Sequence, residues 1–144
     1  MKNQLLTGFA EVSITPQKRI YLAGQFFDRI SEYVETPVTA TAFAVDNGAT
    51  QAVICSCDLG SISKNLITAV REKINGKLDG FISDNLILCA THSHTSHMYN
   101  IAKGTRILDR FFPDAEKPPA VNAEGIDPSE IMTQRETFAF LTEK

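Results

Sequence analysis

Residues 38–57 read VTATAFAVDNGATQAVICSC, a pattern that is typical of a β-hairpin. Small and β-branched residues over 38–45 predict a first strand, and residues 51–57 predict the return strand. Between them, the Asn47-Gly48 pair supplies the positive φ that tight hairpin turns require. The sequence therefore predicts an antiparallel strand pair from which the rest of the fold extends.

A helix and a third strand follow this hairpin. Ser61 or Ser63 is a suitable helix N-cap, and the apolar residues that follow recur at helical spacing: Leu66, Ile67, Val70, Ile74 and Leu78. Residues 86–90, LILCA, form a continuous apolar run, which predicts a strand buried on both faces. Strand, helix and strand over residues 51–90 make a βαβ unit, which favours a parallel strand pair with a right-handed crossover.

A further strand and an irregular crossing are predicted before the hairpin. Residues 7–15, TGFAEVSIT, alternate between apolar and polar side chains, and Pro16 ends the strand that this pattern predicts. Residues 17–36 predict an irregular crossing. The fold class that we expect is α/β, with a mixed sheet that contains the β-hairpin and the βαβ unit, and with helices packed on the sheet.

The carboxyl-terminal third changes in character. Residues 103–126 contain three prolines and many charges, and they predict a long loop of the kind that is usually functional or disordered. Residues 127–130, Asp-Pro-Ser-Glu, predict the start of a helix capped by Asp127, with Ile131, Phe138 and Leu141 on one face. We expect this helix to continue past the last residue, because no C-cap signal ends it.

Length and charge exclude several classes of protein. The 144 residues predict one domain over 1–144, and 43% apolar residues suffice for a core. A net charge of −3 with scattered Lys and Arg does not favour the basic face that a nucleic-acid binder needs, so we expect no nucleic-acid partner. The sequence contains neither a membrane span nor a secretory signal, so we expect a cytoplasmic protein. The odd set Cys55, Cys57 and Cys89 is expected to be buried and reduced, with the first two on one strand face.

All three histidines lie within six residues, at His92, His94 and His97. They follow the carboxyl end of the predicted strand 86–90, where open α/β sheets place their sites. In extended backbone, His92 and His94 point to the same side, and two imidazoles at that spacing can bind one metal ion, most commonly zinc. His97 is predicted either to join them or to face solvent, and a satisfied structural cluster is the alternative for the whole group.

Asp58 ends the strand that neighbours the histidines in the predicted βαβ unit. One interpretation makes it a carboxylate that orients an imidazole at the metal site. The other makes it an aspartate that precedes a helix and binds backbone amides. Because a catalytic zinc ion usually has three protein ligands, His92 and His94 alone leave the expected site incomplete.

Four motifs, taken in order, resemble the amino-terminal part of the catalytic region of the neutral/alkaline, non-lysosomal ceramidase family. They are Gly8-x-Ala10-x-x-x-Ile14-Thr15-Pro16, Leu22-Ala23-Gly24, Cys57-Asp58-Leu59 and Leu88-Cys89-Ala90-Thr91-His92-Ser93-His94. The resemblance implies a zinc-dependent amidase that cleaves the N-acyl bond of a lipid. It implies that His92 binds zinc and that His94 is a catalytic residue in the same site, near the substrate.

The same resemblance implies that the remaining ligands and the nucleophile lie downstream. The chain is therefore expected to be the amino-terminal part of a longer catalytic domain and to carry only part of the site. Its expected partners are a small-molecule or lipid amide substrate and the remainder of that domain. Thr95-Ser96-His97 replaces the Ser-Gly-Pro that commonly follows the histidine motif in this family.

Two alternatives remain open on the same residues. His92-x-His94-x-Ser96-His97 is similar to the H-x-H-x-D-H motif of the metallo-β-lactamase fold, with Ser96 in place of the aspartate. The other alternative is a truncated α/β domain without catalytic activity, in which two or three imidazoles bind metal weakly.

Overall fold

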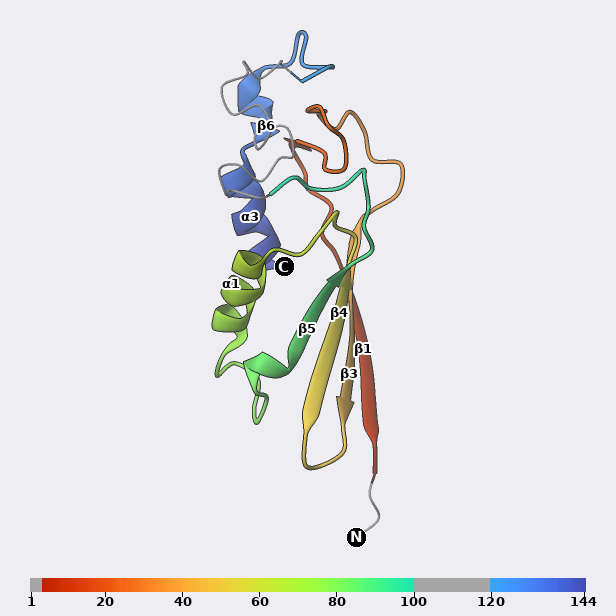
Figure 1. Ribbon diagram of the computed structural model, residues 1–144, viewed down its shortest axis with the longest axis vertical. Coiled ribbons are helices and arrows are strands. Elements are labelled where there is room, and N and C mark those ends of the chain that lie inside the picture. Colours follow the sequence, from red (N-terminus) through yellow and green to blue (C-terminus); the bar gives the residue numbers. More distant parts are fainter. Residues whose placement is uncertain (1–3, 100–119) are drawn as a thin grey trace.

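A four-stranded mixed sheet forms the centre of the fold in the computed structural model, which describes residues 4–99 and 120–144. Its strands lie in the order β1-β3-β4-β5: Leu6–Ser13, Thr39–Asp46, Gln51–Cys57 and Leu86–Ala90 (Figure 1). β3 pairs antiparallel with β1 and β4, whereas β4 and β5 are parallel. The predicted hairpin, the βαβ unit and the α/β fold class are confirmed.

The hairpin turn forms where the Asn-Gly pair predicts it. Gly48 has a φ of +83°, and its N–H donates to Asp46 Oδ1 over 2.7 Å. Asn47 Oδ1 accepts from the N–H groups of Ala49 and Thr50. These local bonds fix the register that pairs Phe43 with Ile54 and Ala40 with Cys57.

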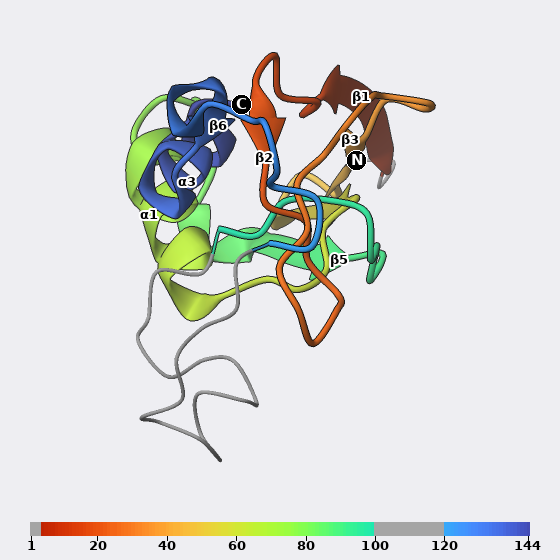
Figure 2. The ribbon, with the colours of Figure 1, turned by 90° about the horizontal axis from the view of Figure 1, so that it is seen from above.

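Two helices cover one face of the sheet. α1, Lys64–Ile74, begins after Ser63, whose Oγ accepts from Leu66 N over 3.2 Å. α3, Gln134–Glu143, lies beside α1 near β4 and β5, while β1 lies at the far edge (Figures 1 and 2). An ion pair between Lys73 and Glu143 joins the two helices. Leu78, predicted on the buried stripe of α1, lies beyond the helix end and is exposed.

The prediction that the last helix starts at Asp127 is wrong, because its N-cap is Thr133. Asp127 caps only a 3₁₀ turn over Pro128–Glu130. Residues Ile131–Met132 then form β6, which pairs parallel with β2, Arg19–Ile20. The helix begins after Thr133 with a capping box: Thr133 Oγ1 accepts from Glu136 N, and the Glu136 carboxylate accepts from Thr133 N. Ile131 is therefore a strand residue, because pairing with β2 holds it in extended backbone.

The segments around β2 are irregular, as predicted, apart from β2 itself and short bridges. Most of the predicted loop 103–126, namely residues 103–119, lies outside the described residues. From residue 120 the chain turns, and Asn122 binds both backbone groups of Ile30 through its side-chain amide. No helix in the described part of the chain combines the length and apolar character of a membrane-spanning segment.

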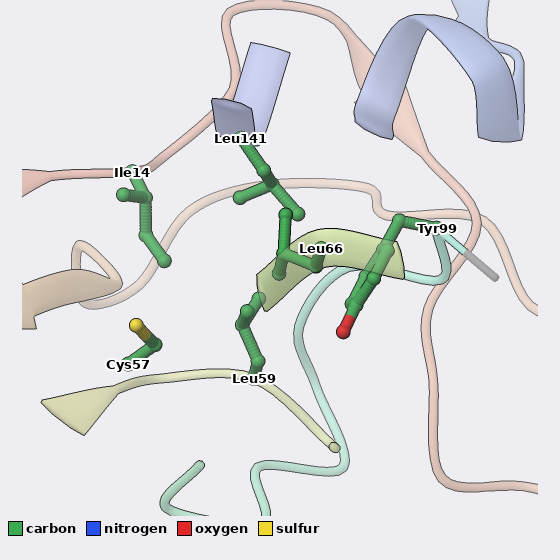
Figure 3. Packing of buried hydrophobic residues seen from close by; sticks show 6 residues of the cluster. All are labelled: Ile14, Cys57, Leu59, Leu66, Tyr99 and Leu141. Atoms are coloured by element: carbon green, nitrogen blue, oxygen red, sulfur yellow. The ribbon is translucent and has the colours of Figure 1, made fainter. Parts of the chain in front are cut away.

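The core lies between the helices and the carboxyl end of β4 (Figure 3). Six buried residues meet there: Ile14, Cys57, Leu59, Leu66, Tyr99 and Leu141. Phe138 packs against this cluster, so the predicted apolar face of the last helix is confirmed for Phe138 and Leu141. The Tyr99 hydroxyl donates to Ser61 O over 2.7 Å and accepts from Ser63 N over 3.0 Å. This tyrosine therefore ties the residues after β5 to the start of α1.

The opposite face of the sheet is open. The register aligns one residue from each strand across it, namely Phe9, Phe43, Ile54 and Ile87. Ile87 is 53% exposed, so the prediction that strand 86–90 is buried on both faces is wrong, because α1 and α3 cover only one of them. Of the cysteines, all free in the structure, Cys57 is buried, Cys55 is half-buried and Cys89 is exposed on the open face. The prediction that Cys89 is buried is therefore wrong.

Candidate functional site

The histidine segment leaves β5 beside the turn that follows β4. Thr91 N donates to Cys57 O over 2.9 Å, and Ser93 N donates to Leu59 O over 3.1 Å. His92 adopts a φ of +65°, a left-handed conformation that is uncommon for a residue with a side chain. The extended backbone predicted for His92 is therefore wrong, and the chain turns sharply at this residue.

The imidazoles of His92 and His94 nevertheless converge. Their Nε2 atoms lie 3.2 Å apart, and the ring centroids are 4.8 Å apart with the planes nearly perpendicular. Both side chains are exposed. The structure therefore brings together the two residues that the sequence singled out, with one nitrogen of each ring directed at the other.

A backbone carbonyl fixes the orientation of the His92 ring. His92 Nδ1 lies 2.6 Å from Gly60 O. A carbonyl oxygen can only accept, so in the neutral ring Nδ1 carries the proton and Nε2 has a free lone pair. The 3.2 Å contact then requires His94 Nε2–H to donate to His92 Nε2. His92 is the acceptor of the pair and His94 the donor.

Two further groups hold His94 in place. Arg29 Nη2 donates to the His94 carbonyl oxygen over 2.6 Å. Gly24, with a φ of +93°, lies directly against the Cα, Cβ and Cγ atoms of His94. Arg29 and Gly60 were not found from the sequence, since a carbonyl or a long arginine side chain gives no periodic signal. Gly24 was visible only as part of the Leu22-Ala23-Gly24 motif.

His97 lies apart from this pair. Its side chain is 1% exposed, its Nδ1 is 3.0 Å from Ser96 Oγ, and its ring stacks on Phe140 of α3. Burial lowers its pKa to about 4, and a backbone hydrogen bond at Ile14 offsets part of that shift. His97 therefore does not face solvent and is a core residue. This position does not fit the third histidine of an H-x-H-x-D-H metal motif.

Within the part of the chain that the structure describes, the Asp58 carboxylate accepts from backbone and hydroxyl groups and not from an imidazole. Oδ2 accepts from Thr39 N over 2.9 Å and from Thr39 Oγ1 over 3.2 Å, and Oδ1 accepts from Thr91 Oγ1 over 3.2 Å. The carboxylate thus joins the start of β3 to the ends of β4 and β5. Its link to the site is indirect, through Thr91, the residue before His92.

The described residues contain no group of three or more His, Cys, Asp or Glu side chains that could hold a metal ion. The candidate site within residues 4–99 and 120–144 is therefore a pair of imidazoles. A cleft of about 680 Å³ opens nearby and is lined by Arg29, Thr95 and Ser96 among others, but neither His92 nor His94 lines it.

No family model matches the chain, and no curated protein matches it. Among solved structures, it is similar to the neutral ceramidase of Pseudomonas aeruginosa, with a TM-score of 0.60 and 22% identity over 66% of this chain. A ceramidase solved in complex with C2 matches with a TM-score of 0.59 and 22% identity over the same share of this chain. The match spans 16% of the length of each ceramidase. The chain thus has the fold of a small part of neutral ceramidase.

Proposed function

We propose that this chain supplies two imidazoles to the zinc site of a ceramidase-like hydrolase that cleaves an N-acyl amide bond. The observation that carries the proposal is the convergence of His92 Nε2 and His94 Nε2 at the carboxyl ends of β4 and β5. The ceramidase-like fold supports the reaction class, and the order of the sequence motifs supports the same assignment.

The spacing of the pair suits a zinc ion. Two nitrogen ligands at about 2.0–2.1 Å from a tetrahedral zinc ion lie roughly 3.3 Å from each other. His92 Nε2 and His94 Nε2 are 3.2 Å apart without any metal, so little movement would be needed to place both at one ion. In the metal-free pair the lone pair of His92 Nε2 accepts the His94 Nε2–H, and a zinc ion would take the place of that proton, which makes His92 the first ligand.

The Gly60 carbonyl completes a pattern found at metal-binding histidines. Such histidines almost always donate the other ring N–H to a carboxylate, a backbone carbonyl or water, which fixes the tautomer and makes the ligating nitrogen more basic. His92 already makes this contact over 2.6 Å. Its left-handed backbone costs free energy, and such strain is commonly concentrated at functional sites.

As an alternative to ligating zinc, which would require His94 Nε2 to lose its proton, His94 is suited to a second role. In the neutral pair its Nε2–H is a donor, and the rigid backbone around it holds that donor at a fixed place. A positioned N–H can stabilise the negative charge that develops on a carbonyl oxygen during amide hydrolysis. When bound, the zinc ion would lower the pKa of a bound water and polarise the substrate carbonyl. The further ligand that a catalytic zinc ion needs would come from outside this pair.

An apolar substrate fits the surroundings of the pair. Phe26 and Phe27 are 72% and 42% exposed, and they follow Gly24 by two and three residues. Because Gly24 contacts His94, these two rings belong to the loop that adjoins the pair. Exposed aromatic side chains on this loop offer apolar surface of the kind that an acyl chain can cover. A lipid amide is therefore the substrate class that we propose.

The proposal is tested by the release of fatty acid from a short-chain N-acylsphingosine by a protein that joins this chain to the downstream residues expected to complete the site, measured with and without added Zn²⁺. We expect zinc-dependent release by the wild-type protein that His92→Ala abolishes and His97→Gln retains. Release that persists in His92→Ala contradicts the proposal. A zinc-loaded wild-type protein that releases no fatty acid also contradicts it and favours the non-catalytic α/β domain.

A further inference from the structure

Gly24 approaches His94 more closely than any side chain could. A Cβ atom at position 24 would lie 2.3 Å from His94 Cγ, 2.5 Å from its Cβ and 2.7 Å from its Cα. Carbon atoms at optimal contact are about 3.5–4.0 Å apart, so all three approaches are deep overlaps. The smallest side chain at position 24 would thus displace His94 or the segment that carries Gly24.

Backbone hydrogen bonds hold the segment that carries Gly24 in place. Ala23 N donates to Ser96 O over 2.8 Å, and Met98 N donates to Tyr21 O over 2.8 Å. Leu22 forms an antiparallel bridge with His97, whose side chain is buried in the core. Backbone hydrogen bonds therefore join the residues before Gly24 to the residues after His94. A side chain at position 24 would consequently displace His94 and not the segment that carries Gly24.

The same loop holds His94 at a second point. Leu22 N donates to Arg29 O over 2.9 Å and closes the loop between them. From the base of this loop, Arg29 Nη2 donates to the His94 carbonyl oxygen over 2.6 Å. Gly24 thus sets the position of the Cα–Cγ axis of His94, and Arg29 sets the orientation of its peptide group.

We propose that Gly24 is the positioning residue for His94: its missing side chain provides the space in which the His94 ring meets His92 Nε2. The inference rests on the proposed function in that it assigns a purpose to this ring position. The other glycines with positive φ that the structure describes, Gly48, Gly76, Gly80 and Gly125, have no heavy atom within 4 Å of where a Cβ would lie. Gly24 therefore differs from them in packing as well as in backbone angle.

The test uses the metal-free chain, so that zinc binding does not enter. Ring protons of His92 and His94 are close enough for a nuclear Overhauser effect, since the ring centroids are 4.8 Å apart. We expect this effect in the wild type, its loss in Gly24→Ala, and its retention in Gly125→Ala. The control also lies at a positive φ, +76° against +93°, but would produce no overlap.

An effect that is absent in the wild type, or that persists in folded Gly24→Ala, overturns the proposal. If Gly24→Ala does not fold, Arg29→Ala replaces it, with Arg19→Ala as its control, because Arg19 donates to the carbonyl of Ser31 and not to that of His94. We then expect a weaker ring contact in Arg29→Ala alone, and equal contacts in both variants overturn the proposal. Subsequent Zn²⁺ addition separates the two ideas: a wild type that shows the ring contact but binds no zinc contradicts only the proposed function.

Discussion

His92 Nδ1 lies 2.6 Å from the carbonyl oxygen of Gly60, and this contact joins the residues that follow two neighbouring parallel strands. Gly60 follows β4 and His92 follows β5, so parallel pairing places both at one edge of the sheet. A Cβ at Gly60 would lie 3.1 Å from Ala23 Cβ and 3.3 Å from Ser93 O. The turn that supplies the acceptor is therefore packed tightly against both flanking segments.

Asp58 gives the first prediction, because its carboxylate accepts three hydrogen bonds that tie the sheet edge together. Asp58→Ala would leave the Thr39 amide without its acceptor. We expect a loss of about 1–3 kcal/mol in the free energy of unfolding, measured by urea denaturation. Asp84→Ala, which removes an ion pair from an 82% exposed carboxylate, should cost less than about 1 kcal/mol. Equal losses in the two variants would show that Asp58 does not tie the strands.

His97 makes stability depend on pH. Burial lowers its pKa to about 4, against 6.5 in an unfolded chain. As the pH drops below 6.5, His97 binds a proton in the unfolded state but not in the folded state. The free energy of unfolding therefore decreases with decreasing pH until the pH reaches about 4. The contribution is about 3 kcal/mol, fully present above pH 6.5. His97→Gln should flatten this part of the urea-midpoint profile, and profiles that run parallel in the two proteins would contradict the assignment.

Thr133 caps the last helix, whereas Asp127 caps only a short turn. Thr133→Ala removes the acceptor for Glu136 N, and we expect a loss of about 1 kcal/mol in the free energy of unfolding. Asp127→Ala should have a smaller effect, because no helix depends on it. Thermal unfolding followed by circular dichroism ranks the two variants, and the reverse ranking would restore the helix start that the sequence suggests.

The sequence was sufficient for features that depend on local patterns. Small and β-branched residues with the Asn47-Gly48 turn predicted the hairpin, and the apolar run at 86–90 predicted β5 with its bounds. Features that depend on distant partners were missed. Ile131 enters a strand because β2 lies beside it, and His97 is buried because α3 covers it. The helix start at Asp127 and an exposed His97 were predicted from neighbouring residues alone. Tertiary contacts determine the structure at both places.

Cysteine reactivity separates the two faces of the sheet. Cys89 is exposed on the open face, whereas a hydrogen bond with Cys55 and burial raise the pKa of the Cys57 thiol well above its usual range. Because the thiolate is the reactive form, we expect a disulfide reagent to modify Cys89 quickly and Cys57 only on unfolding. Cys89→Ser should remove the modification of the exposed thiol and Cys57→Ser should leave it, while half-buried Cys55, whose pKa a hydrogen bond with Cys57 lowers to about 7, would react next. A fast phase that survives Cys89→Ser would place the reactive thiol elsewhere.

The paired imidazoles of His92 and His94 are tested most directly by calorimetric titration of the chain with Zn²⁺ at pH 7.5. We expect one ion per chain, an affinity at least about tenfold weaker in His92→Ala and in His94→Ala, and unchanged binding in His97→Gln. Zinc binding that His92→Ala leaves unchanged would show that this pair does not hold the ion.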